Sequence, residues 1–145
     1  MTLLFRSVCY FLPEHSIVFT GDTIFCGGVG RFFEGDAKDM VAAVKKIKDL
    51  GPETRIFPGH EYSVSNLKFA KYYDDNNKAI ESELHNFVKL RSDDKFTIPS
   101  TVKFENQINP FFRYDQPELI KKSGGTTEVE VMKLIRESKN SFRPK

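Results

Sequence analysis

Two short segments carry side chains that could bind a metal ion. Asp22 lies in Thr20-Gly-Asp-Thr-Ile-Phe25, and His60 lies in Phe57-Pro-Gly-His-Glu-Tyr62. Each residue stands beside a glycine just past a hydrophobic, strand-like run, and strand ends are where α/β sheets place ligands. A carboxylate could bridge two metal ions, and an imidazole supplies one nitrogen. Alone, an aspartate there is a turn former and a histidine an ordinary packed or surface residue. Together they predict a shared site.

The secondary structure expected around this site changes in type near residue 60. Residues 1–61 have α/β character and residues 62–145 are helical, which predicts two domains. In the first part we expect strands over residues 7–12, 16–20 and 54–58. Asp36 is expected to cap a helix over residues 37–50. Five glycines between residues 21 and 35 predict a segment without regular structure that wraps around something.

The second part contains four helical patterns and one irregular stretch. Ser63 is expected to cap a helix over residues 64–73, and Thr127-x-x-Glu130 is a capping-box pattern. Apolar residues at helical spacing predict further elements. The predicted helices are residues 64–73, 77–90, 117–123 and 127–140. Pro99 and Pro110 predict an irregular stretch over residues 92–114.

Composition narrows the class of protein. The 145 residues contain 22 Lys and Arg against 20 Asp and Glu, a net charge of +2. This is not the large basic excess that is typical of nucleic-acid-binding proteins. No apolar run reaches the roughly 18 residues of a membrane span. Arg6 interrupts the start too early for a secretory signal. Cys9 and Cys26 cannot form a disulfide framework. The expected location is therefore intracellular, in the cytoplasm or the mitochondrial matrix.

An ordered set of motifs then resembles a known family. These motifs are Gly21-Asp-Thr-Ile-Phe25, Gly30-Arg-Phe-Phe-Glu-Gly35, Gly59-His-Glu-Tyr62, Asn66-Leu-Lys-Phe-Ala70, Pro99-Ser-Thr101 and Asn109-Pro-Phe111. Together they closely resemble the C-terminal half of glyoxalase II (hydroxyacylglutathione hydrolase), a member of the metallo-β-lactamase superfamily. The resemblance implies an α/β (α+β) fold: part of an αββα sandwich, followed by a helical glutathione-binding domain.

The resemblance also implies an activity and a site. The activity is hydrolysis of S-acylglutathione thioesters, such as S-lactoylglutathione, by hydroxide bound to two divalent metal ions. Zinc is the first expectation, with iron or manganese as alternatives, because bound cations activate water and polarise a carbonyl. By motif position Asp22 matches the bridging carboxylate and His60 a histidine ligand. The positions at or near the glutathione moiety are Arg31, Phe33, Tyr62, Arg136 and Lys139. Arginine and lysine suit its two carboxylates, whereas Phe33 replaces a tyrosine and loses a hydroxyl.

This sequence departs from the family where most metal ligands are expected. The signature T-H-x-H-x-D-H is absent, and Leu4-Phe5-Arg6 stands where a further histidine is expected. Two ligands cannot hold a metal pair, so we expect these 145 residues alone to be inactive and to bind no metal. His15 cannot substitute, because a strand separates it from Asp22 by roughly 16 Å. His85 is expected on a solvated helix, and Cys9 and Cys26 in the interior.

Other interpretations stay open at this point. The chain could be a non-catalytic module that binds glutathione conjugates, or a persulfide dioxygenase-type oxidoreductase with one iron, although the long helical tail argues against the latter. Without the resemblance, Arg136 and Lys139 would be cations near a helix C-terminus, and Lys45, Lys46 and Lys48 a solvated face. The aromatic residues 32, 33, 111 and 112 are expected to pack between the two parts. Exposed strand edges predict self-association.

Overall fold

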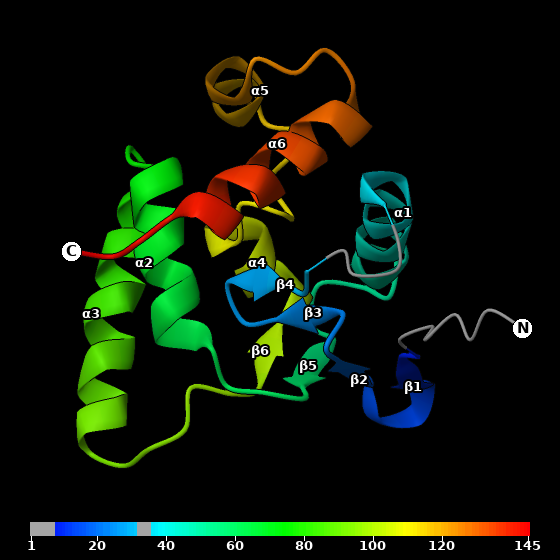
Figure 1. Ribbon diagram of the computed structural model, residues 1–145. Helices are drawn as coiled ribbons and strands as arrows, with labels where there is room; N and C mark the ends of the chain where they lie inside the picture. The colour runs from blue at the N-terminus through cyan, green and yellow to red at the C-terminus, as the bar shows by residue number, and fades with distance from the viewer. Residues whose placement is uncertain (1–7, 32–35) are drawn as a thin grey trace, which may run out of the picture.

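A mixed four-stranded sheet ends at the positions of Asp22 and His60. In the computed structural model, which describes residues 8–31 and 36–145, the strand order is β1-β2-β5-β6 (Figure 1). Strand β1 (Tyr10–Leu12) pairs antiparallel with β2 (Ile17–Gly21), β2 pairs parallel with β5 (Arg55–Pro58), and β5 pairs antiparallel with β6 (Ser100–Thr101). Because β2 and β5 are parallel neighbours, their C-terminal ends share one edge of the sheet.

A crossover connects the two parallel strands. It contains a hairpin of β3 (Ile24–Phe25) and β4 (Gly28–Val29), followed by helix α1 (Ala37–Lys48). The expectation that the glycine-rich segment holds no regular element is therefore wrong for residues 24–29. Strands of two residues are too short to leave an alternating pattern in a sequence. Asp36 caps α1 as predicted, in a reciprocal capping box with Asp39.

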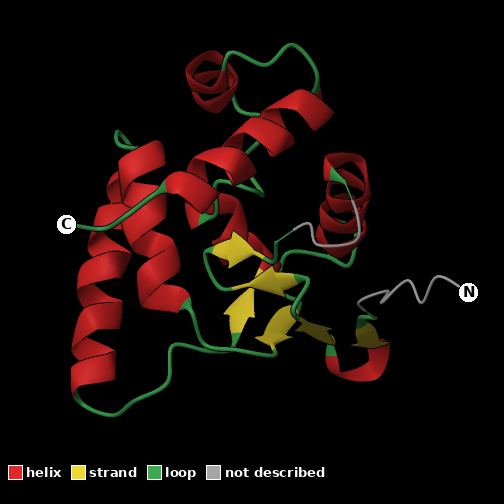
Figure 2. Cartoon of the chain, in the orientation of Figure 1, coloured by secondary structure: helices red, strands yellow, loops and turns green. Residues whose placement is uncertain are grey.

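The helical part follows β5 and contributes a strand to the sheet (Figure 2). In the sheet region, a 3-10 turn, η1 (Pro13–His15), connects β1 to β2. The helices are α2 (Ser63–Tyr73), α3 (Lys78–Ser92), α4 (Val102–Ile108), α5 (Pro117–Ser123) and α6 (Glu128–Ser141). No helix within the described ranges is both long and apolar enough to cross a membrane.

Three local predictions about the helical part need correction. Residues 92–114 are not irregular throughout, because they contain β6 and α4. Ser63 is the first residue of α2 rather than its cap; Tyr62 occupies the cap position without a side-chain bond, and the Ser63 hydroxyl accepts a bond from Thr97 instead. Thr127 caps α6 as predicted, but the Glu130 carboxylate reaches one residue further back, to the Thr126 amide at 2.8 Å.

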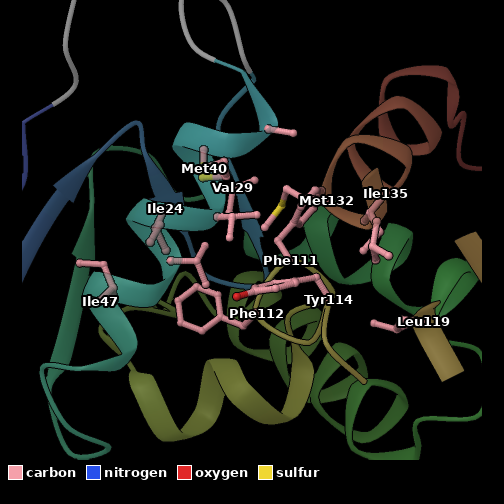
Figure 3. Close-up of a cluster of buried hydrophobic side chains, with 14 of the residues drawn as sticks. Ile24, Val29, Met40, Ile47, Phe111, Phe112, Tyr114, Leu119, Met132 and Ile135 are labelled. Atoms are coloured by element: carbon pink, nitrogen blue, oxygen red, sulfur yellow. The ribbon is translucent and has the colours of Figure 1, made fainter. Parts of the chain in front are cut away.

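The main hydrophobic core joins the sheet, α1 and the C-terminal helices. The buried set includes Val18 and Ile56 from the sheet, Val44 from α1, and Met132 and Ile135 from α6. Figure 3 shows that the side chains of the loop residues Phe111, Phe112 and Tyr114 lie among them. Phe111 and Phe112 therefore pack where the two parts of the chain meet, as the sequence predicts. The division at residue 61 stays a prediction, because this core is continuous across it.

The lysines of α1 do not form one solvated face. Lys48 lies with its ammonium 5.3 Å from the centre of the Tyr114 ring and 6.0 Å from that of Phe112, and burial lowers its pKa. Lys45 pairs with Glu128 of α6 at 2.5 Å, and Lys46 is exposed. The prediction therefore holds for the exposed Lys45 and Lys46. It is wrong for Lys48, which fixes α1 against the loop before α5.

Candidate functional site

The two strand-end residues meet at one point on the sheet edge. His60 Nδ1 lies 2.7 Å from Asp22 Oδ1, and about half or more of each side chain is exposed to solvent. One residue follows β2 and the other follows β5, so the parallel pairing of these strands sets the contact. The arrangement presents a carboxylate and an imidazole together at an open surface.

Close backbone packing fixes the position of Asp22. The Gly59 amide donates to the Gly21 carbonyl at 2.8 Å, which ties together the ends of β2 and β5. A Cβ atom at Gly59 would lie 3.0 Å from Asp22 Oδ1 and 3.1 Å from the Gly21 carbonyl carbon. A larger residue at position 59 would therefore displace the Asp22 carboxylate or the end of β2.

The described residues do not form a complete metal centre. Between residues 8 and 31 and between residues 36 and 145, no group of three or more His, Cys, Asp or Glu side chains is placed to hold a metal ion. A catalytic zinc ion takes about three protein ligands, so Asp22 and His60 do not by themselves fit a two-metal centre. They fit two of its ligands by chemistry, and they are near each other.

Aromatic rings pack around His60. The Tyr62 ring stacks parallel to the His60 ring at a centroid distance of 5.2 Å, and Phe25 meets Tyr62 edge-on at 5.0 Å. Tyr62 is 47% exposed, so its hydroxyl can still reach a ligand. These contacts orient the imidazole and join it to the start of α2.

A cluster of three cations, Arg31, Arg136 and Lys139, lies near α2. The Arg136 guanidinium, on α6, is buried and donates to the Val29 carbonyl at 3.0 Å and to Asn140 at 3.0 Å. Its charge lies 5.5 Å from the centre of the Phe111 ring. Lys139, one turn further along α6, donates to the side-chain oxygen of Asn66 on α2. The partners that the described residues give Arg136 and Lys139 are thus neutral oxygens and an aromatic face.

Burial and mutual repulsion shift the pKa values of this cluster. Burial, together with the charges of Arg136 and Arg31, lowers the pKa of Lys139 to about 7. Burial, assisted by Arg31, lowers the pKa of Arg136 to about 10. An anionic ligand would favour the charged forms of both side chains, because it supplies an opposite charge that the described residues do not give them. The cluster is therefore suited to bind carboxylates.

The remaining predicted residues fall as follows. Arg31 is exposed at the end of the β3–β4 hairpin and close enough to Arg136 and Lys139 to influence both. Phe33 lies outside the described residues. His85 is exposed on α3, as predicted. Cys26 is buried, and Cys9 is half-buried against the main core.

One residue that binds the cation cluster, Asn66, was not predicted from the sequence. Asn66 is buried on α2, where its oxygen accepts from Lys139 and its nitrogen donates to the Cys26 carbonyl at 3.0 Å. It is one turn beyond Tyr62, whose carbonyl accepts from the Asn66 amide at 2.8 Å. The signal available was its place in the quoted motif Asn66-Leu-Lys-Phe-Ala70.

Two family models match this chain, and its fold agrees with them. A partial metallo-β-lactamase domain, followed by a helical region, is consistent with the mixed sheet and with the model of the metallo-beta-lactamase superfamily, which matches residues 7–60. That superfamily implies divalent metal binding. The model described as "Hydroxyacylglutathione hydrolase C-terminus" matches residues 61–142. The chain therefore belongs to the hydroxyacylglutathione hydrolase family.

Curated relatives agree with this assignment. A hydroxyacylglutathione hydrolase from Synechococcus sp. (strain JA-3-3Ab) is 38% identical over 135 residues, which are 93% of this chain and 54% of the relative. One from Erythrobacter litoralis is also 38% identical, with the same coverage. A probable hydroxyacylglutathione hydrolase from Schistosoma mansoni is 36% identical over 141 residues, 93% of this chain and 59% of the relative. The chain spans about half the length of the curated relatives it matches.

Proposed function

We propose that this chain forms the glutathione-binding region, and two metal ligands, of a glyoxalase II-like enzyme that hydrolyses S-acylglutathione thioesters to a carboxylic acid and glutathione. S-lactoylglutathione, which gives lactate, is the substrate we expect. The observation that carries the proposal is that the carboxylate–imidazole pair and the cation cluster both contact the first turn of α2, the pair through Tyr62 and the cluster through Asn66.

The cation cluster would bind the glutathione moiety. Glutathione carries two carboxylates, and Arg136 and Lys139 have only neutral partners among the described residues. Arg31 and the Tyr62 hydroxyl lie on the edges of the same region and would add a charge and a hydrogen-bond donor. Phe33, where the family has a tyrosine, would contribute no hydroxyl. Binding in this orientation would direct the thioester toward Asp22 and His60.

Asp22 and His60 would be ligands of a pair of divalent metal ions, with zinc expected first. Such a pair supplies a bound hydroxide and polarises the thioester carbonyl. The two residues do not complete that centre, so further ligands must come from residues beyond those described. The proposed location, cytoplasm or mitochondrial matrix, follows only from the cysteine content and stays a prediction.

A second candidate function follows from the incomplete ligand set. In isolation these residues would bind glutathione conjugates without hydrolysing them, as a non-catalytic module. The observation in its favour is that the described residues contain the cation cluster but only two of the ligands. The two candidates differ in metal content and turnover, not in ligand binding.

The test compares the 145-residue chain with a chimera. In the chimera, the amino-terminal part of the Synechococcus relative is joined to this chain at the start of their similarity. We expect the chimera to hold two metal ions, measured by plasma mass spectrometry, and to hydrolyse S-lactoylglutathione. We expect the chain alone to do neither and to bind S-methylglutathione in calorimetry.

The control is Asp22→Ala in both forms. It should abolish metal binding and hydrolysis by the chimera while leaving S-methylglutathione binding by the chain intact. A chimera that hydrolyses the substrate equally well with Asp22→Ala would contradict the role proposed for Asp22. A chain that binds no glutathione derivative would contradict both candidate functions.

A further inference from the structure

The β3–β4 hairpin is held at four consecutive residues by buried side chains of the helical part. Asn66 of α2 donates to the Cys26 carbonyl at 3.0 Å, and Arg136 of α6 donates to the Val29 carbonyl at 3.0 Å. Between them, Glu105 of α4 accepts from the Gly27 amide at 2.9 Å, and Asn109 donates to the Gly28 carbonyl at 3.2 Å. All four side chains are at most 5% exposed.

Glu105 is the central group of this arrangement. Its carboxylate is fully buried and accepts three hydrogen bonds, from the Gly27 amide, from Asn109 at 2.8 Å and from the Ser100 hydroxyl. An ionisable group is rarely buried without a partner of opposite charge, and this one is surrounded by neutral donors. Neither metal binding nor the binding of glutathione, as proposed above, uses it.

The two glycines of the turn allow these side chains to come so close. A Cβ atom at Gly27 would lie 2.8 Å from a Leu67 methyl carbon, and one at Gly28 would lie 2.8 Å from the Asn66 amide group. The backbone of the turn therefore rests directly on α2. These close contacts therefore hold the hairpin in a fixed position against the helices.

The hairpin in turn adjoins the candidate site at both of its ends. The Gly30 amide donates to the Thr23 carbonyl at 3.0 Å and so closes the hairpin with a pair of residues, Thr23 and Gly30. Asp22 immediately precedes this closing pair. Arg31 immediately follows it. A displacement of the turn would therefore be carried along two short strands to both residues.

We propose that Glu105 is a positioning residue of the site: by holding the Gly27 amide, it fixes the β3–β4 hairpin on the helical part and so sets the positions of Asp22 and Arg31. The part of this inference that concerns ligand affinity rests on the proposed function. The part that concerns the hairpin does not.

The test uses three variants of the full chain. Glu105→Asp is one methylene shorter and cannot reach Ser100 and Gly27 together. Glu105→Gln keeps the length; its amide can donate to Ser100 while its oxygen accepts from Gly27 and Asn109, so it is the rescuing variant. Asp74→Leu is the matched control, because Asp74 is a buried carboxylate that binds Arg113 and Asn77 and makes no bond to the hairpin.

Three readouts separate positioning from general loss of stability. In Glu105→Asp, amide exchange at Gly27 should accelerate by about tenfold, the effect expected for one lost hydrogen bond. The NMR signals of the His60 ring, which contacts Asp22, should shift. The dissociation constant for S-methylglutathione should rise by about fivefold, a smaller effect because the ligand contacts remain. Glu105→Gln should restore all three.

Each other outcome has a defined meaning. Unchanged Gly27 exchange or unchanged His60 signals in Glu105→Asp would overturn the proposal, as would equal changes in Asp74→Leu at a similar melting temperature. If the unaltered chain binds no S-methylglutathione, the proposed function fails, while the exchange and His60 readouts still decide the role of Glu105. Should Glu105→Asp not fold, failure of Glu105→Gln to preserve Gly27 protection would also overturn it.

Discussion

The affinity for glutathione derivatives should depend on pH through Lys139. The pKa of this lysine is lowered to about 7 by burial and by the charges of Arg136 and Arg31. A bound carboxylate would favour the ammonium form and raise the pKa toward its ordinary value of 10.5. The free chain must then take up a proton to bind the ligand, so affinity should fall as pH rises through 7.

The size of the effect follows from the fraction of free Lys139 that is protonated. With a pKa of about 7, this fraction is about 0.9 at pH 6 and about 0.09 at pH 8. If the complex keeps the lysine charged throughout, the dissociation constant for S-methylglutathione should rise about tenfold between these two pH values.

Isothermal titration calorimetry at pH 6, 7 and 8 measures this directly. Repeating it in buffers of different ionisation enthalpy also counts the protons taken up, which should approach one per ligand at pH 8. Lys139→Met should bind weakly with nearly constant affinity over the same range. A tenfold dependence that persists in Lys139→Met would refute the assignment to Lys139, and a flat profile in the unaltered chain would refute the lowered pKa.

Three further predictions concern stability and association. Because the pKa of Lys139 is lowered in the folded chain, the unfolded chain binds more protons between about pH 7 and 10.5, and the free energy of unfolding should rise with pH in this range. Urea unfolding at pH 7 and 8.5 should show this rise in the unaltered chain and a smaller rise in Lys139→Met. Phe111→Ala, which empties a fully buried position of the main core, should cost about 3–5 kcal/mol, and an effect below about 1 kcal/mol in the same assay would contradict that packing. On the sheet, Tyr10, Phe19 and Phe57 are cross-strand neighbours, and Tyr10 and Phe19 are 67% and 45% exposed. We propose that the chain self-associates through these residues, so Phe19→Glu should reduce its sedimentation coefficient at high concentration. A chain that is monomeric both with and without the change would contradict the proposal.

The parts of the fold that could be predicted from sequence are those with a local signal. Helix α1 has both an N-cap aspartate and a regular apolar face, and α6 has a capping threonine. Strands β2 and β5 are short apolar runs bounded by turns. Their parallel pairing brings Asp22 to His60, and the glycines that follow each strand indicated that position.

The elements that were missed depend on distant contacts. Helix α4 has seven residues, too few to show a period, and Pro99 and Pro110 on either side of it suggested a loop. The β3–β4 hairpin is stabilised by side chains that lie far away in the sequence. For the same reason nothing local indicated that Glu105 is buried, since a glutamate on a short helix is ordinarily exposed.

The proposed function depends on the cation cluster near the Asp22–His60 pair binding the glutathione moiety of a thioester. The most direct measurement is calorimetric titration of the 145-residue chain at pH 6 with S-methylglutathione, beside the double variant Arg136→Leu and Lys139→Met and beside Lys121→Met on α5 as a control for net charge. We expect one ligand to bind per chain, and we expect the double variant to lose this binding and Lys121→Met to retain it. Equal binding by all three proteins, or none by the unaltered chain, would contradict it.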